Sequence, residues 1–181
     1  MVNIVGYLLR LTAATRTTPC CSLLWHSAIE RVTMHATDAE LSDVLTGQLG
    51  DEKIVAAAYA RVNTSLSPAR MLTPLGNYLV ARPAARSSAK KITEQTGVPL
   101  DAAVVFGVGS SALHVWTADP MLNRVGKHLG QVPYEKIASI KVEGGKTWQP
   151  VTITMADGTS VTLEGRGAIH AVAAEFDKHK A

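Results

Sequence analysis

Apolar and polar residues alternate most regularly over residues 150–165, PVTITMADGTSVTLEG. Every second residue is apolar on both sides of the segment 156–158, which is the period of a half-buried β-strand. A three-residue loop places Ile153 opposite Val161, whereas a two-residue loop would place apolar residues opposite polar ones. The pattern therefore predicts a β-hairpin with Gly158 at a positive φ, a conformation that glycine adopts without steric cost.

The chain before this hairpin contains further short apolar runs with strand-like periods. Turn residues at Gly109 and Ser110 separate two of these runs, and another pair follows later. The four predicted strands are residues 102–109, 111–117, 129–132 and 137–142. Residues 52–62 are ambiguous, because their alanines favour a helix whereas Ile54 and Tyr59 suit a strand. We interpret 52–62 as a strand, since it completes a set of seven short antiparallel strands.

Helical spacing marks the region before the first strand. Thr37 and Glu40 have the T-x-x-E spacing of a capping box, in which each side chain bonds a free backbone N–H. Leucine and valine follow at helical intervals, and Gly50 is suited to end the helix. The pattern predicts an N-terminal helix over residues 38–49.

Two more helices are predicted. Residues 63–100 form a long connection with a helix of its own, in which Pro83 occupies the first turn and Gly97 follows the last. An apolar stripe at helical spacing over residues 168–178 predicts a C-terminal helix. The connection therefore inserts a helix between the first and second strands.

Residues 1–33 show neither period. They lack the basic start, uninterrupted apolar run and cleavage site of a secretory signal, which argues against export. Their low acidity and spaced arginines leave a transit-like amphipathic helix as an alternative. We expect a poorly ordered extension that can be removed without loss of stability, followed by a single domain over residues 34–181.

Four segments carry a resemblance to a known family. They are VFGVGSSALHVW (105–116), LGQVPYEKIASIKVEGG (129–145), VTITMADGTSVTLEG (151–165) and the helix at 168–178. Together they resemble the bacterial pleckstrin-homology-like (PH-like) domain, which is related to the short PH and GRAM-like modules of actinobacterial proteins. The resemblance implies an α+β fold: a partly open antiparallel β-barrel of about seven strands capped by the C-terminal helix, with its core over residues 102–178. The N-terminal helix and the helical insert would be additions to it.

The resemblance implies binding rather than catalysis. PH domains that bind phosphoinositides have Lys and Arg at the end of the first strand and along the second. The second strand predicted here, AAVVFGVG at residues 102–109, contains no basic residue. Phosphoinositide binding therefore does not carry over to this chain.

Composition bounds the class of protein. A chain of 181 residues that is 46% hydrophobic is large enough for one domain with a real core. No stretch approaches the roughly 20 apolar residues of a membrane-spanning helix. Cys20 and Cys21 are adjacent, so they offer neither a disulfide framework nor metal-ligand spacing. We expect a cytoplasmic protein, or one attached peripherally to the inner face of the membrane.

Positive charge is concentrated in one segment. Residues 61–100 contain six basic residues against Glu94 alone, a net charge of +5. Four of the basic residues fall on or beside one face of the predicted insert helix and are the candidate surface for anions or an anionic membrane. They are Arg82, Arg86, Lys90 and Lys91. An ordinary solvated helix face is the alternative interpretation.

No motif predicts a catalytic, cofactor-binding or metal-binding residue. The chain has no nucleophile elbow, phosphate-binding loop, dinucleotide fingerprint or zinc-ligand spacing. His128, in an expected loop, and His170 and His179 have no partner at ligand spacing. His114 and Trp116 share one face of a strand and are candidates to line a small pocket; the alternative is ordinary surface residues beneath the insert.

These observations favour a non-enzymatic binding module for a protein partner or an anionic membrane surface. A small-ligand-binding β-barrel is the alternative, and an enzyme assembled from distant residues is the less favoured third hypothesis. The pI of about 9.0 gives some support to nucleic-acid binding. The strands nevertheless lack the alternation of basic and aromatic residues that such a surface needs.

Overall fold

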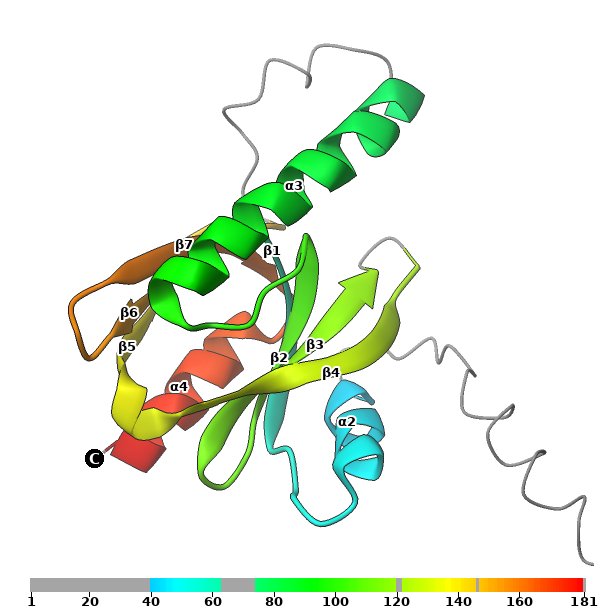
Figure 1. Ribbon diagram of the computed structural model, residues 1–181. Coiled ribbons are helices and arrows are strands. Elements are labelled where there is room, and N and C mark those ends of the chain that lie inside the picture. The colour runs from blue at the N-terminus through cyan, green and yellow to red at the C-terminus, as the bar shows by residue number, and fades with distance from the viewer. Residues whose placement is uncertain (1–39, 63–73, 120–121, 146, 181) are drawn as a thin grey trace, which may run out of the picture. The chain divides into compact units, whose positions relative to one another are not determined.

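The computed structural model describes residues 40–62, 74–119, 122–145 and 147–180, all within one compact unit of the chain. The expected extension over residues 1–33 and the capping-box residue Thr37 lie outside these ranges. Within them the chain forms seven strands and three α-helices, labelled in Figure 1. None of the described helices combines the length and apolar character needed to cross a bilayer.

The strands form one antiparallel sheet in the order β4-β3-β2-β1-β7-β6-β5. Their bounds are β1 Ala56–Val62, β2 Ala103–Val108, β3 Ala112–Asp119, β4 Arg124–Pro133, β5 Ile137–Val142, β6 Gln149–Met155 and β7 Ser160–Arg166. β4 and β5 are joined only by the short 3₁₀-helix η2 (Tyr134–Lys136), yet they are the two edges of the sheet, which is not closed. The predicted α+β class and the seven strands are confirmed.

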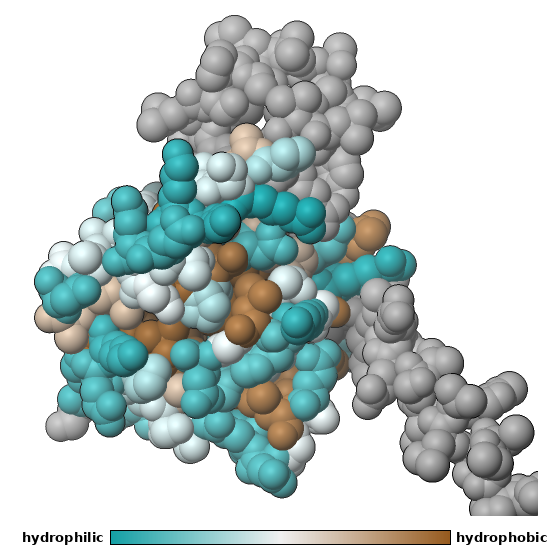
Figure 2. All heavy atoms as spheres, viewed as in Figure 1, coloured by the Kyte–Doolittle hydropathy of each residue, from teal (hydrophilic) through white to brown (hydrophobic). Residues whose placement is uncertain are grey.

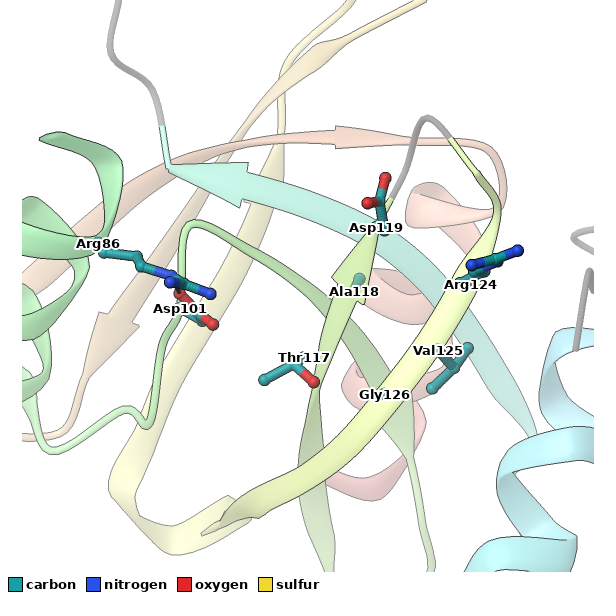
Figure 3. Close-up of a pocket in the computed structure, with 8 residues that line it drawn as sticks. All are labelled: Arg86, Asp101, Thr117, Ala118, Asp119, Arg124, Val125 and Gly126. Carbon is teal, nitrogen blue, oxygen red and sulfur yellow. Dashed lines mark hydrogen bonds and ion pairs between the residues drawn. The ribbon is translucent and has the colours of Figure 1, made fainter. Parts of the chain in front are cut away.

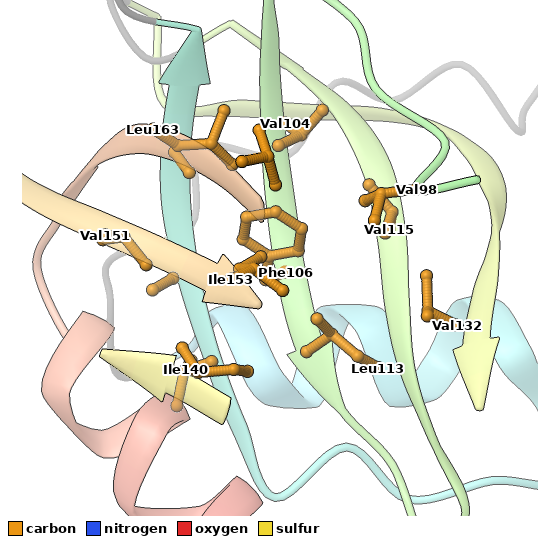
Figure 4. Close-up of a cluster of buried hydrophobic side chains, with 14 of the residues drawn as sticks. Val98, Val104, Phe106, Leu113, Val115, Val132, Ile140, Val151, Ile153 and Leu163 are labelled. Atoms are coloured by element: carbon orange, nitrogen blue, oxygen red, sulfur yellow. The ribbon is translucent and has the colours of Figure 1, made fainter. Parts of the chain in front are cut away.

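The larger cluster of buried side chains, here called the inner core, contains residues of all seven strands. Its members include Val98, Val104, Phe106, Leu113, Val115, Val132, Ile140, Val151, Ile153 and Leu163 (Figure 4). A flat sheet of seven strands would be about 29 Å wide, because neighbouring strands lie ~4.8 Å apart. Both edge strands reach the same core, so the sheet curls around it. The C-terminal helix α4 (Ile169–Lys180) fills the core with three buried side chains.

A second cluster, the outer core, buries the opposite face of β1, β2 and β3. Its members are Leu41, Leu45, Ile54, Ala57, Tyr59, Val105, Trp116 and Val125. The leucines come from α2 (Leu41–Leu49), which covers this face. A strand buried on both faces has a continuous apolar run instead of alternation, which is why residues 52–62 were ambiguous in the sequence. The small alanines of β1 also let helices approach the strand closely from both sides.

The N-terminal helix differs from its prediction at one end. α2 begins at Leu41, three residues later than expected, with Glu40 at the N-cap position. The glutamate of a capping box stands three residues after the N-cap, inside the helix. The side chain of Glu40 makes no capping hydrogen bond. The predicted end is confirmed, because Gly50 closes α2 with φ of 76°.

The insert helix α3 (Pro74–Thr96) was predicted to start near Pro83, which was wrong: Pro83 lies inside it. The first turn tolerates proline because its N–H would have no partner there, and Pro74 occupies that turn instead. Pro83 removes one helical hydrogen bond but sits on the exposed side of α3. The end of the helix at Thr96, with Gly97 at φ of 71°, agrees with the prediction.

β4 is also longer than the predicted strand at 129–132. It spans Arg124–Pro133, and its register with β3 shifts on both sides of Trp116. Each shift inserts an irregularity that breaks the period-2 pattern. The sequence pattern was therefore visible only over the last part of β4.

The hairpin of β6 and β7 has the predicted register and loop. Ile153 pairs with Val161, and Gly158 has φ of 86°. Because Ile153 is 1% exposed, Ile153→Asp buries a charge without a partner and should lower the free energy of unfolding by about 3 kcal/mol or more. Thr154→Asp, on the half-exposed face of the same strand, should cost less than about 1 kcal/mol. Urea denaturation compares the two variants, and equal losses would contradict this register.

Candidate functional site

His114 and Trp116 lie together on the outer face of β3, as predicted, and both are buried, at 2% and 0% exposure. Their ring centroids are 5.8 Å apart. Trp116 belongs to the outer core beneath α2, whereas α3 packs on the inner core. They are therefore not surface residues beneath the insert. His114 is the one buried polar or charged residue in the part of the chain that the structure describes.

Glu52 reaches His114 from the loop between α2 and β1. Its Oε2 lies 2.9 Å from Nε2 of His114, which is an ion-pair distance without the alignment of a hydrogen bond. Its Oε1 accepts hydrogen bonds from the backbone N–H and the hydroxyl of Ser110, at 2.7 and 2.9 Å. Ser110 lies in the turn between β2 and β3, so one carboxylate joins this turn, the α2–β1 loop and the buried imidazole.

His128 completes the cluster from β4, where it pairs with Trp116 in the sheet. Its Nε2 lies 3.3 Å from Nδ1 of His114, and its ring centroid lies 4.9 Å from that of Trp116. The prediction of a loop at His128 was wrong, because the irregular register of β4 hid the strand. We call Glu52, His114, Trp116 and His128 the histidine cluster.

Burial and neighbouring groups shift three pKa values around the histidine cluster. Burial acts to raise the pKa of Glu52, but the hydrogen bonds from Ser110 and the charge of His114 together outweigh it, so the pKa is lowered. Burial, and then the charge of His114, lowers the pKa of His128. Burial, and then the charges of Glu52 and Glu175, raises the pKa of Tyr134 to about 12.

The histidine cluster does not have the arrangement of a nucleophilic catalyst. The Ser110 hydroxyl donates to the Glu52 carboxylate, whereas an activated serine donates to an imidazole that removes its proton. Among the residues placed by the structure, no three His, Cys, Asp or Glu side chains are arranged to hold a metal ion. The two imidazoles and the carboxylate of the cluster can take up and release protons.

A separate pocket of about 290 Å³ lies where α3, the segment before β2 and the ends of β3 and β4 approach one another (Figure 3). It is lined by Arg86, Asp101, Thr117, Ala118, Asp119, Arg124, Val125 and Gly126. Arg86 and Asp101 lie on one side of it and Arg124 on the other. The predicted pocket residues His114 and Trp116 do not line it. Two arginines facing one space provide donors for a phosphate or carboxylate, although two aspartates balance their charge.

The predicted anion surface lies on α3. The side chains of Arg86, Lys90 and Lys91 are exposed, and that of Arg82 lies outside the described part of the structure. Two partners reduce the charge: Nε of Arg86 lies 3.2 Å from Asp101, and Nζ of Lys90 lies 4.0 Å from Glu94. Exposed ion pairs of this kind contribute about 0–1 kcal/mol, so an approaching anion can compete for these cations.

Arg61, the first basic residue of the 61–100 segment, is engaged elsewhere. It lies 2.6 Å from Glu164 of β7 and stacks over the ring of Trp148, 4.0 Å from its centroid. The guanidinium of Arg166 lies 5.6 Å from the same ring. These contacts tie the loop before β6 to the outer faces of β1 and β7, so Arg61 does not belong to the α3 surface.

Comparison of the sequence with family models and with curated proteins gave no match. The functional interpretation therefore depends on the geometry of the histidine cluster, the pocket and α3. Sequence reasoning missed Glu52, His128 and Arg124. The only signal was an unpaired histidine on an apolar strand, because a buried imidazole needs a polar partner from somewhere in the fold.

Close packing beneath the histidine cluster gives a testable consequence. A Cβ added to Gly107 of β2 would lie 2.8 Å from Cζ3 of Trp116 and 3.1 Å from Ile54. We expect Gly107→Ala to lower the free energy of unfolding by about 1–3 kcal/mol, because the buried indole must shift. Thermal or urea unfolding measures this loss.

Gly47→Ala is the matched control. No atom lies within 4 Å of a Cβ at Gly47, on the exposed side of α2. Alanine there should stabilise the protein by about 0.5–1 kcal/mol through its higher helix propensity. If Gly107→Ala were as well tolerated as Gly47→Ala, the indole would not be packed as described.

Proposed function

We propose that this chain is a non-enzymatic binding module of the PH-like type that docks on an anionic membrane surface through α3. The strand order supports the PH-like assignment. A seven-stranded antiparallel sheet curls around a helix that directly follows the last strand. That arrangement is the one implied by the resemblance in the sequence, with α2 and α3 as additions.

The observation that carries the choice of partner is the exposure of the basic side chains of α3. Figure 2 shows hydrophilic side chains along the described part of this helix. α3 contains four basic residues and one acidic residue, Glu94, a net charge of +3. Over residues 83–96, where the side chains are described, the exposed residues are charged, polar, Ala or Pro, which favours an anionic surface over an apolar one.

The free energies expected for these basic residues indicate weak docking. Each basic residue near an anionic bilayer contributes about 1 kcal/mol, and the ion pairs to Asp101 and Glu94 reduce the contributions of Arg86 and Lys90. The pocket beside α3 adds Arg124 from β4, which gives headgroup phosphates a second set of donors. Attachment would therefore be peripheral, reversible and sensitive to salt, since screening acts over about 8–10 Å.

A protein partner is the second candidate, because the same exposed cations would suit an acidic protein surface. A small anionic ligand bound in the pocket is a further alternative. Both alternatives predict that vesicles leave the protein in solution, so one measurement separates them from membrane docking.

Co-sedimentation with vesicles rich in phosphatidylserine tests the proposal. The parent chain is compared with a variant in which four residues of α3 are replaced by Ser: Arg82, Arg86, Lys90 and Lys91. We expect the parent to bind at low salt. It should lose most of its binding at about 0.5 M salt, where the screening length is only several ångströms. The variant should bind poorly even at low salt. Vesicles of neutral phosphatidylcholine should not bind either protein.

A control variant removes the same charge from other elements. It replaces four exposed lysines by Ser: Lys53, Lys136, Lys141 and Lys178. We expect it to keep most of the parent's binding. Equal loss of binding in the two variants would show that net charge alone attracts the protein to the vesicles. Absence of binding by the parent would contradict the membrane proposal.

A further inference from the structure

We propose that Glu52, His114 and His128 form an acid-released latch that holds β4 against the rest of the outer core at neutral pH. The inference is independent of membrane docking, since none of the three residues lies on α3. It rests on the way four distant parts of the chain meet at one buried imidazole. These parts are the α2–β1 loop, the β2–β3 turn, β3 and β4.

A carboxylate oxygen 2.9 Å from Nε2 of His114 favours a proton on that nitrogen. The charge of His114 that acts on Glu52 and His128 places a proton on Nδ1 as well. Nδ1–H then donates to Nε2 of a neutral His128 at 3.3 Å, and Ser110 fixes the Glu52 carboxylate on the other side.

His128 faces His114 of β3 and, behind His114, Glu52 of the α2–β1 loop. Tyr134 of η2 donates its hydroxyl to the carbonyl of Gly109 and stays neutral, because its pKa is about 12. Trp116 contacts the ring of His128, and α2 adds leucines and Val44 to the outer core. A proton on His128 would place two N–H donors and two positive charges opposite one another across the 3.3 Å contact with His114.

The lowered pKa of His128 sets the sign of the pH dependence. Burial, and then the charge of His114, lowers the pKa of His128 in the folded chain, while a hydrogen bond with the Gly130 backbone acts in the opposite direction. A histidine with a lowered pKa binds a proton more readily in the unfolded chain. Its contribution to stability is therefore complete above the unfolded value of about 6.5 and decreases as the pH falls below it.

β4 is an edge strand that pairs only with β3, and its register is irregular on both sides of Trp116. Local opening there breaks fewer ladder hydrogen bonds than opening of an inner strand. His128 is half-buried, so a short movement brings its ring into water. The same strand supplies Arg124 and Gly126 to the pocket, so release of the latch would change that pocket as well.

NMR of the full chain over about pH 5–8 tests the latch directly. We expect the His128 ring to titrate with a midpoint below 6.5, and the indole resonance of Trp116 to shift with the same midpoint. Amide protection along β4 should fall with acid more than protection along β6. A His128 midpoint at or above 6.5, or a Trp116 resonance that does not respond, would overturn the proposal.

A second measurement uses His128→Gln, which keeps a hydrogen-bond acceptor but cannot be protonated. The melting temperature of the parent should fall between about pH 7.5 and 5.5, and the variant should lose most of that fall. His170→Gln, at an exposed position of α4, is the matched control and should retain the parent's pH dependence. An unchanged pH dependence in His128→Gln would overturn the latch. If that variant does not fold, the NMR titration of the parent still decides the question.

Discussion

Burial of β1, β2 and β3 on both faces is the constraint on which the rest of this structure depends. The inner core packs against one face and the outer core against the other, with α4 and α2 as the respective helices. Burial of apolar side chains is the dominant favourable term in folding. Because most positions along these strands are buried, small residues are needed wherever a helix or an indole approaches. Gly107 under Trp116 and the alanines of β1 meet that need.

The same constraint accounts for the histidine cluster. A polar side chain on a strand enclosed on both faces must find its partners inside the protein, since an unpaired buried polar group is costly. His114 contacts Glu52 and His128, and the Ser110 hydroxyl donates a hydrogen bond to Glu52. An apolar residue at His114 would fill the space without these contacts. In the proposed latch, the imidazole makes the contacts of one loop, one turn and one edge strand depend on a proton.

The positively charged residues lie apart from the two cores. The outer and inner cores leave little room for ions, and no Lys or Arg among the described residues is buried. These cations lie on α3 and α4, on loops and on several strands. Over residues 83–96, α3 packs on the inner core through Ala85, Ala89 and Ile92, and most of its other side chains are exposed. A helix with that design can present a charged side to a partner while the sheet provides stability. The proposed docking surface and the proposed latch therefore lie on separate elements.

The sequence by itself determined the local elements with strong periodic signals. The β6–β7 hairpin, its register, the position of Gly158 and the C-terminal helix follow from alternation over a few residues and from turn chemistry. The starts of α2 and α3 were misplaced because capping residues and prolines act similarly at several nearby positions. Only the tertiary structure decided that His114 meets Glu52, 62 positions earlier in the chain, and His128 on an irregular strand. Such contacts depend on strand pairing and loop closure between distant segments, and no local period in the sequence encodes them.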